Sequence, residues 1–201
     1  MPWPRVSPGG MVTLSLSFAV GMMATVTVNA DDLPSFNLVC AAVVAHFKAK
    51  PDHADGDLIT QDDFDAIDQA LSDLGWKGSE LAKLRERVEP SDSFLAKEAA
   101  SREGRQFMRR VSRIPFGYDR LDHLSRLSDG RTIVRKLVKG PGGDQLIRYL
   151  ATADGGREMG LMLSQAPSGE DFNRPTGRIY TEADLLSALK TAYDHDMAAG
   201  N

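Results

Sequence analysis

The chain has 201 residues, a formal net charge of −4 and a hydrophobic content of 42%, values typical of a globular protein rather than of a disordered one. Its single cysteine excludes an intramolecular disulfide, so the fold must depend on packing. The length is sufficient for one domain with its own hydrophobic core.

Residues 1–30 have the pattern of a secretory signal. The run from Met11 to Val28 carries no charge, and Val28 and Ala30 are small residues at the positions that signal peptidase reads. A retained membrane anchor is the alternative, which eighteen residues containing five serines and threonines fit less well. We therefore expect a cleaved signal, a secreted or periplasmic mature chain, and no membrane association after cleavage.

Charge divides the mature chain, residues 31–201, into three parts. Residues 31–96 carry 14 acidic and 6 basic side chains, residues 97–148 carry 6 and 13, and residues 149–201 carry 8 and 4. We interpret the domain as an acidic helical part over 31–96, a basic helical part over 97–167, and a loop with a C-terminal helix over 168–201.

Apolar residues recur at intervals of three and four, which predicts helices. The expected helices cover residues 35–49, 60–74, 78–88 and 93–113, and a last one begins at Thr181. Thr60 with Asp63, and Thr181 with Asp184, have the spacing of a helix-capping pair. The predicted fold is mainly α, a single domain of short helices.

A glycine spacing interrupts this pattern in the basic part. Gly130, Gly143 and Gly156 lie thirteen residues apart, and a weaker unit begins at Gly117. The units align apolar residues in two columns: Ile133, Leu146 and Met159, and Leu137, Leu150 and Leu163, with Leu124 in the weaker unit. This predicts a 13-residue helical repeat over 117–167, whose short helices are stable only when stacked. Chance periodicity of glycine-linked helices, or strands over 132–138 and 158–164, are the alternatives.

Clustered arginines in the basic part indicate a surface for an anionic partner, because arginine binds carboxylate or phosphate bidentately. The candidate residues are Arg105, Arg109, Arg113, Arg135 and Arg148. The expected partner is an acidic protein surface or an anionic cell-envelope polymer. Nucleic acid is not expected, because the chain is net acidic and carries an export signal. The alternative is that acidic and basic faces lie against one another or are solvated.

Residues 53–64, HADGDLITQDDF, lie between two predicted helices and resemble an EF-hand calcium loop. The alignment needs a one-residue deletion at the turn glycine, and His53 stands where a carboxylate usually opens the loop. The resemblance implies calcium bound by oxygens of Asp52, Asp55, Asp57 and Asp63. The alternative is an acidic turn that leads into a capped helix.

The sequence contains no histidine pair with zinc-ligand spacing, no phosphate-binding loop and no nucleophile elbow. We therefore expect a non-catalytic binding or scaffold domain that acts outside the cytoplasm and needs no cofactor. A calcium-responsive module that uses residues 52–63 is the alternative.

Overall fold

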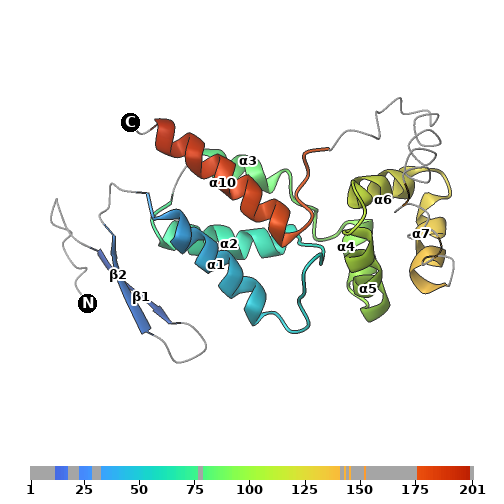
Figure 1. The fold of residues 1–201 in the computed structure, drawn as a ribbon, viewed down its shortest axis with the longest axis horizontal. Coiled ribbons are helices and arrows are strands. Elements are labelled where there is room, and N and C mark those ends of the chain that lie inside the picture. The colour runs from blue at the N-terminus through green and yellow to red at the C-terminus, as the bar shows by residue number, and fades with distance from the viewer. Residues whose placement is uncertain are drawn as a thin grey trace, which may run out of the picture.

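The structure is a computed structural model that describes residues 12–17, 23–28, 33–76, 79–140, 143, 145, 152 and 176–199. The expected mainly helical fold is confirmed. The helices are α1 Phe36–Ala49, α2 Gln61–Asp73, α3 Ser79–Arg85, α4 Phe94–Ala99, α5 Arg102–Val111, α6 Gly117–Arg126, α7 Gly130–Lys139 and α10 Glu182–Ala199. Figure 1 shows their arrangement.

Two strands precede the helices. Strand β1, Val12–Ser17, pairs antiparallel with β2, Met23–Val28, in a register that joins Val12 to Val28. The signal peptide stays a prediction. Among the residues that the structure describes, no helix is long and apolar enough to cross a membrane.

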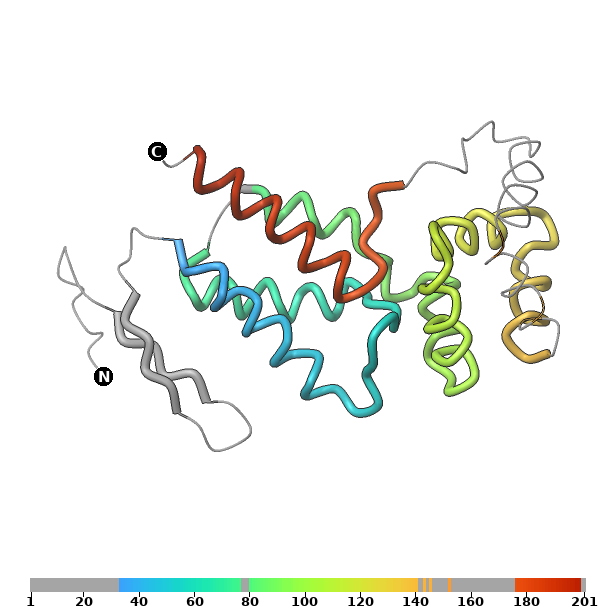
Figure 2. The backbone as a smooth tube through the Cα atoms, in the orientation of Figure 1, coloured from blue at the N-terminus to red at the C-terminus, as the bar shows by residue number. Residues whose placement is uncertain are grey.

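The first helix group consists of α1, α2, α3 and α10, which surround one hydrophobic cluster. The chain leaves this group after α3 and returns through α10, which packs against α1 and α3 (Figure 2). Its core contains the face predicted for α2, since Phe64, Ile67, Leu71 and Leu74 are all buried. The Asp63 carboxylate accepts a hydrogen bond from the Thr60 N–H at 3.1 Å, which confirms the predicted cap of α2.

The second helix group consists of α4, α5, α6 and α7, which surround a separate cluster. The expected continuous helix over 93–113 is wrong, because the chain breaks between α4 and α5. Ser101 causes the break: its hydroxyl accepts from the Gly104 N–H at 3.0 Å and so starts a new helix. Ile133, expected to point inward, is 42% exposed, and its neighbour Val134 is buried instead.

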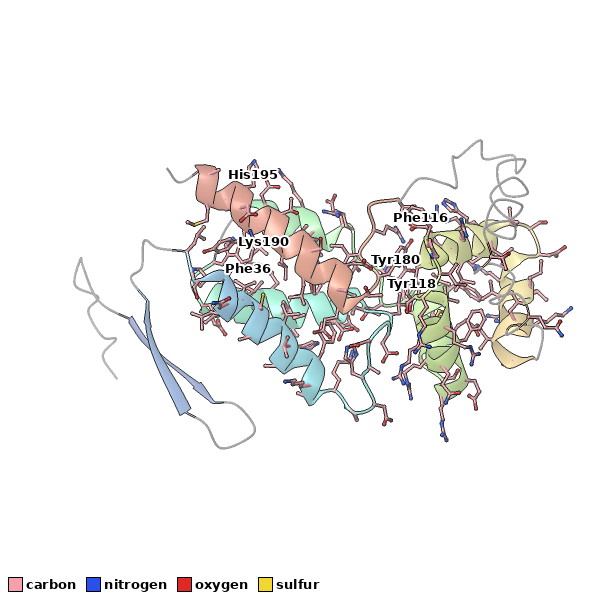
Figure 3. The ribbon with its side chains drawn as sticks, in the orientation of Figure 1. Phe36, Phe116, Tyr118, Tyr180, Lys190 and His195 are labelled. Atoms are coloured by element: carbon pink, nitrogen blue, oxygen red, sulfur yellow. The ribbon has the colours of Figure 1, made fainter. Side chains whose placement is uncertain are left out.

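Two tyrosines join the helix groups (Figure 3). Tyr118 on α6 stacks on Tyr180, which precedes α10, with ring centroids 5.1 Å apart. The Tyr118 hydroxyl donates to the Gly56 carbonyl at 2.8 Å. Burial raises the pKa of Tyr118 well above its ordinary value, so its hydroxyl stays protonated and remains a donor.

Backbone hydrogen bonds order the segments beside these tyrosines. The Ile59 N–H donates to the Tyr180 carbonyl at 2.9 Å, and the Ile179 N–H donates to the Arg87 carbonyl at 2.8 Å. The loop between α1 and α2 is thereby tied to the segment that enters α10. It is this loop that faces the second helix group.

Candidate functional site: a cleft between the helix groups

A cleft lies between the loop that joins α1 to α2 and the helices α4 and α5. It consists of two adjoining hollows of about 350 and 550 Å³, which share Asp52, His53 and Arg105. The polar residues that define it are Lys50, Asp52, His53, Asp57, Asp63, Arg102, Arg105, Gln106 and Arg109, and the apolar ones include Leu58, Ala96, Ala99 and Met108. We name it the junction cleft.

Helix α5 supplies the basic wall of the junction cleft. Arg102 is followed by Arg105, Gln106 and Arg109 at distances of three, four and seven residues along the chain. This spacing places the four side chains along one side of a helix. The neighbouring positions Phe107, Met108 and Val111 are buried in the second cluster. Burial of that apolar side therefore fixes the orientation in which α5 presents its arginines.

Arg109 is committed to an ion pair across the junction. Its Nε and Nη2 donate to the two carboxylate oxygens of Asp57 at 2.5 and 2.9 Å, and Nη2 also donates to the Asp52 carbonyl. Asp57 is only 6% exposed and also accepts from the Ala54 N–H at 3.0 Å. The hydrogen bond to Asp57 raises the pKa of Arg109. This bidentate pair joins α5 to the loop.

Asp63 is the second acid with cationic partners. Its Oδ1 accepts from Lys50 Nζ at 2.5 Å and lies 3.0 Å from His46 Nε2. Burial alone would raise the pKa of Asp63, but the hydrogen bonds with His46 and Lys50 lower it well below the ordinary range. The carboxylate is therefore ionised, and its charge is compensated within the first helix group.

His53 is held by contacts on three sides. Its ring stacks on Phe47 with centroids 4.5 Å apart, its Nε2 lies 3.2 Å from Glu182 Oε2, and its Nδ1 lies 3.7 Å from Asp57 Oδ2. The side chain is 11% exposed. Such a ring supports the loop, and its two nitrogens already face carboxylates.

Two cations of the junction cleft have no acidic partner among the described residues: Arg102 and Arg105. Arg102 is exposed, and Arg105 is half-buried with its Nη1 donating to the Ala100 carbonyl at 2.8 Å. Arg109 and Lys50 compensate the cleft carboxylates of Asp57 and Asp63. The exposed Asp52 is the third acid of the cleft, so four lysine and arginine side chains face three carboxylates. The uncompensated charge of this wall is therefore positive, and its chemistry suits a carboxylate or phosphate group.

The other three arginines predicted for an anionic partner lie elsewhere. Arg113 is exposed and does not line the junction cleft. Arg135 on α7 forms an ion pair with Glu98 at 2.9 Å. Arg148 lies outside the described residues. Of the predicted arginines, the structure therefore brings only Arg105 and Arg109 together in the junction cleft. Arg109 is engaged there by the carboxylate of Asp57.

The calcium prediction concerns the same loop. Asp57 is held by Arg109, and Asp63 by Lys50 and His46, whereas Asp52 and Asp55 are exposed. Among the residues that the structure describes, no group of three histidine, cysteine or acidic side chains is arranged to hold a metal ion. Calcium binding therefore stays a prediction.

Four residues of the junction cleft were not predicted as anion-binding residues: Arg102, Gln106, Lys50 and His53. The helical spacing of Arg102 and Gln106 around Arg105 could have identified those two, whereas Lys50 and His53 join the cleft only through tertiary contacts.

Comparison with known proteins returns no match, neither a family model, nor a curated protein, nor a solved structure.

Proposed function

We propose that the protein is a non-catalytic binding domain whose junction cleft accepts an anionic group. The observation that carries the proposal is the pair Arg102 and Arg105, which line the cleft beside the already compensated Arg109 and have no acidic partner in the described part of the chain. A pocket with an apolar part and a few convergent polar groups is the usual form of a ligand site.

The location between two helix groups also supports this function. Ligand sites occur preferentially where separately packed units meet, since ligands there contact both. Here α5 supplies donors, while the loop between α1 and α2 supplies Lys50 and the supported ring of His53. The predicted export signal of residues 1–30 supports an activity outside the cytoplasm, with acidic proteins and anionic polymers as the candidate partners.

A titration with citrate tests the proposal, because citrate presents several carboxylates in a small molecule. Calorimetry at low salt should detect binding that the double substitution Arg102→Gln with Arg105→Gln weakens about tenfold or more, because two charge-assisted bonds are lost. The matched control is Arg113→Gln, which removes an exposed cation just beyond the same helix and outside the cleft. Equal effects of the control and the double variant would contradict the proposal.

A further inference from the structure

The 13-residue glycine spacing predicted over 117–167 also includes Gly104. Beyond Gly143, the predicted repeat lies outside the described residues apart from 145 and 152. Gly104, Gly117, Gly130 and Gly143 are each thirteen residues apart. A Cβ atom on each would meet the carbonyl oxygen six residues earlier, at 1.7, 2.0, 1.7 and 2.1 Å respectively. Each glycine thus permits the same close approach to the preceding helical turn, which a side chain would block.

A buried residue follows at a constant offset. Met108, Leu121 and Val134 each lie four residues after one of these glycines, and all are buried in the second cluster. Leu95 occupies the same offset after Ser91 and belongs to the same cluster. Close approach and inward position recur together at Gly104, Gly117 and Gly130, so the three units that begin at these glycines have the features of successive copies of one 13-residue module.

Two of these modules carry an arginine pair at equivalent positions, one and five residues after the glycine. The first pair is Arg105 and Arg109, which line the junction cleft. The second is Arg131 and Arg135 on α7, both exposed. The guanidinium carbons of Arg131 and Arg135 lie 5.6 and 5.3 Å from the centroid of the same aromatic ring, that of Phe94.

Helix α4 connects the two pairs. Its residues Ala96 and Ala99 line the junction cleft beside Arg105, while Phe94 and Glu98 contact the pair on α7. A helix with its side chains is about 10 Å wide. The two pairs therefore lie within reach of one extended polymer of a few units.

The charge balance is the same at both pairs. Asp57 compensates Arg109, and Glu98 compensates Arg135. Arg105 and Arg131 remain without an acidic partner among the described residues, so each pair offers about one uncompensated charge. At the junction cleft, Arg102 adds a second cation and Asp52 adds an acidic side chain, so the excess there stays at about one positive charge. One excess positive charge per site suits a polymer that carries one negative charge per unit, such as a polycarboxylate.

We infer that the second helix group is an array of 13-residue modules whose two arginine pairs together bind a linear polycarboxylate. The inference rests on the proposed function for the first pair and adds a second site and a class of ligand. A polymer that occupies both sites binds more tightly than a ligand at either site alone, because its second contact is intramolecular.

Fluorescence anisotropy with labelled poly-L-glutamate and with a blocked di-glutamate peptide tests this inference. The polymer should bind about tenfold or more tightly per chain than the short peptide. Arg131→Gln should remove that advantage and lower the stoichiometry of the short peptide from about two per chain to about one, because the junction cleft still binds it. The matched control is Lys136→Gln, an exposed cation on the same helix, which should retain the advantage of the polymer.

The outcomes separate this inference from the proposed function. Equal affinity for polymer and short peptide would overturn the two-site surface, and so would equal losses of polymer affinity in Arg131→Gln and Lys136→Gln. In either case, binding of the short peptide that depends on Arg105 would leave the proposed function of the junction cleft standing. Tighter binding of single-stranded oligo-thymidine than of poly-L-glutamate would overturn the ligand class. Absence of binding by citrate and by both glutamate probes would overturn the proposed function as well.

Discussion

Replacing Arg109 by methionine removes the partner of a carboxylate that is only 6% exposed. Loss of one partner from a fully buried ion pair costs about 3–5 kcal/mol, because the remaining charge is left without compensation. The Arg109 side chain is 27% exposed, so water entering there screens Asp57 in part. We therefore expect the free energy of unfolding to fall by about 2 kcal/mol.

A double-mutant cycle isolates this interaction. Urea unfolding of Arg109→Met, Asp57→Asn and the double variant should give a coupling energy of about 1.5 kcal/mol, because the second substitution no longer strands a charge. The matched control is the cycle of Asp65 with Arg85, whose side chains are 48% and 54% exposed. That cycle should give about 0.5 kcal/mol or less. Equal coupling energies in the two cycles would refute the assignment of the Asp57–Arg109 pair as a stabilising ion pair between the helix groups.

Three further predictions concern the modules, the loop and its carboxylates. Gly130→Ala should lower the free energy of unfolding by about 2 kcal/mol or more, since its Cβ would lie 1.7 Å from a carbonyl oxygen. Gly75→Ala, whose Cβ would meet no described atom within 4 Å, should lower it by only about 1 kcal/mol because of the positive φ of Gly75. Similar losses at both glycines would contradict the close approach. Asp63 has a lowered pKa in the folded chain, so its contribution to stability is complete above about pH 5 and is lost progressively as the pH falls from the ordinary aspartate value of about 3.9 toward the lower value of the folded chain. Acid melting curves of Asp63→Asn should lack that part of the loss, and an unchanged pH dependence would contradict the assignment. Millimolar calcium should not shift the melting temperature, because cations already compensate Asp57 and Asp63, whereas a site occupied at a hundred times its dissociation constant would add about 2.7 kcal/mol.

Local periodicity was sufficient to predict most of the helices. The buried face of α2 and its Thr60 cap follow from spacing alone, since both depend on residues within two turns. The break at Ser101 was missed because apolar residues continue on both sides of it, so the pattern does not distinguish one helix from two. The inward position of Val134 rather than Ile133 depends on the rotation of α7 against its neighbours, which spacing does not determine.

The candidate site was less predictable than the fold. A cluster of arginines indicates positive charge but does not show which of them acids will compensate. Arg109 and Asp57 are far apart in sequence, and only the packing of α5 against the loop brings them together. The same packing leaves Arg105 without an acidic partner in the described part of the chain. The distinction between a structural arginine and a ligand-binding one therefore required tertiary contacts.

The measurement that tests the junction cleft most directly is an NMR titration with citrate that follows the side-chain Nε–H signals of the arginines. The signals of Arg102 and Arg105 should shift together and saturate, while that of Arg113 should stay in place. Uniform shifts of all exposed arginines, or saturation at Arg113 before Arg105, would contradict the assignment of the junction cleft as the anion-binding site.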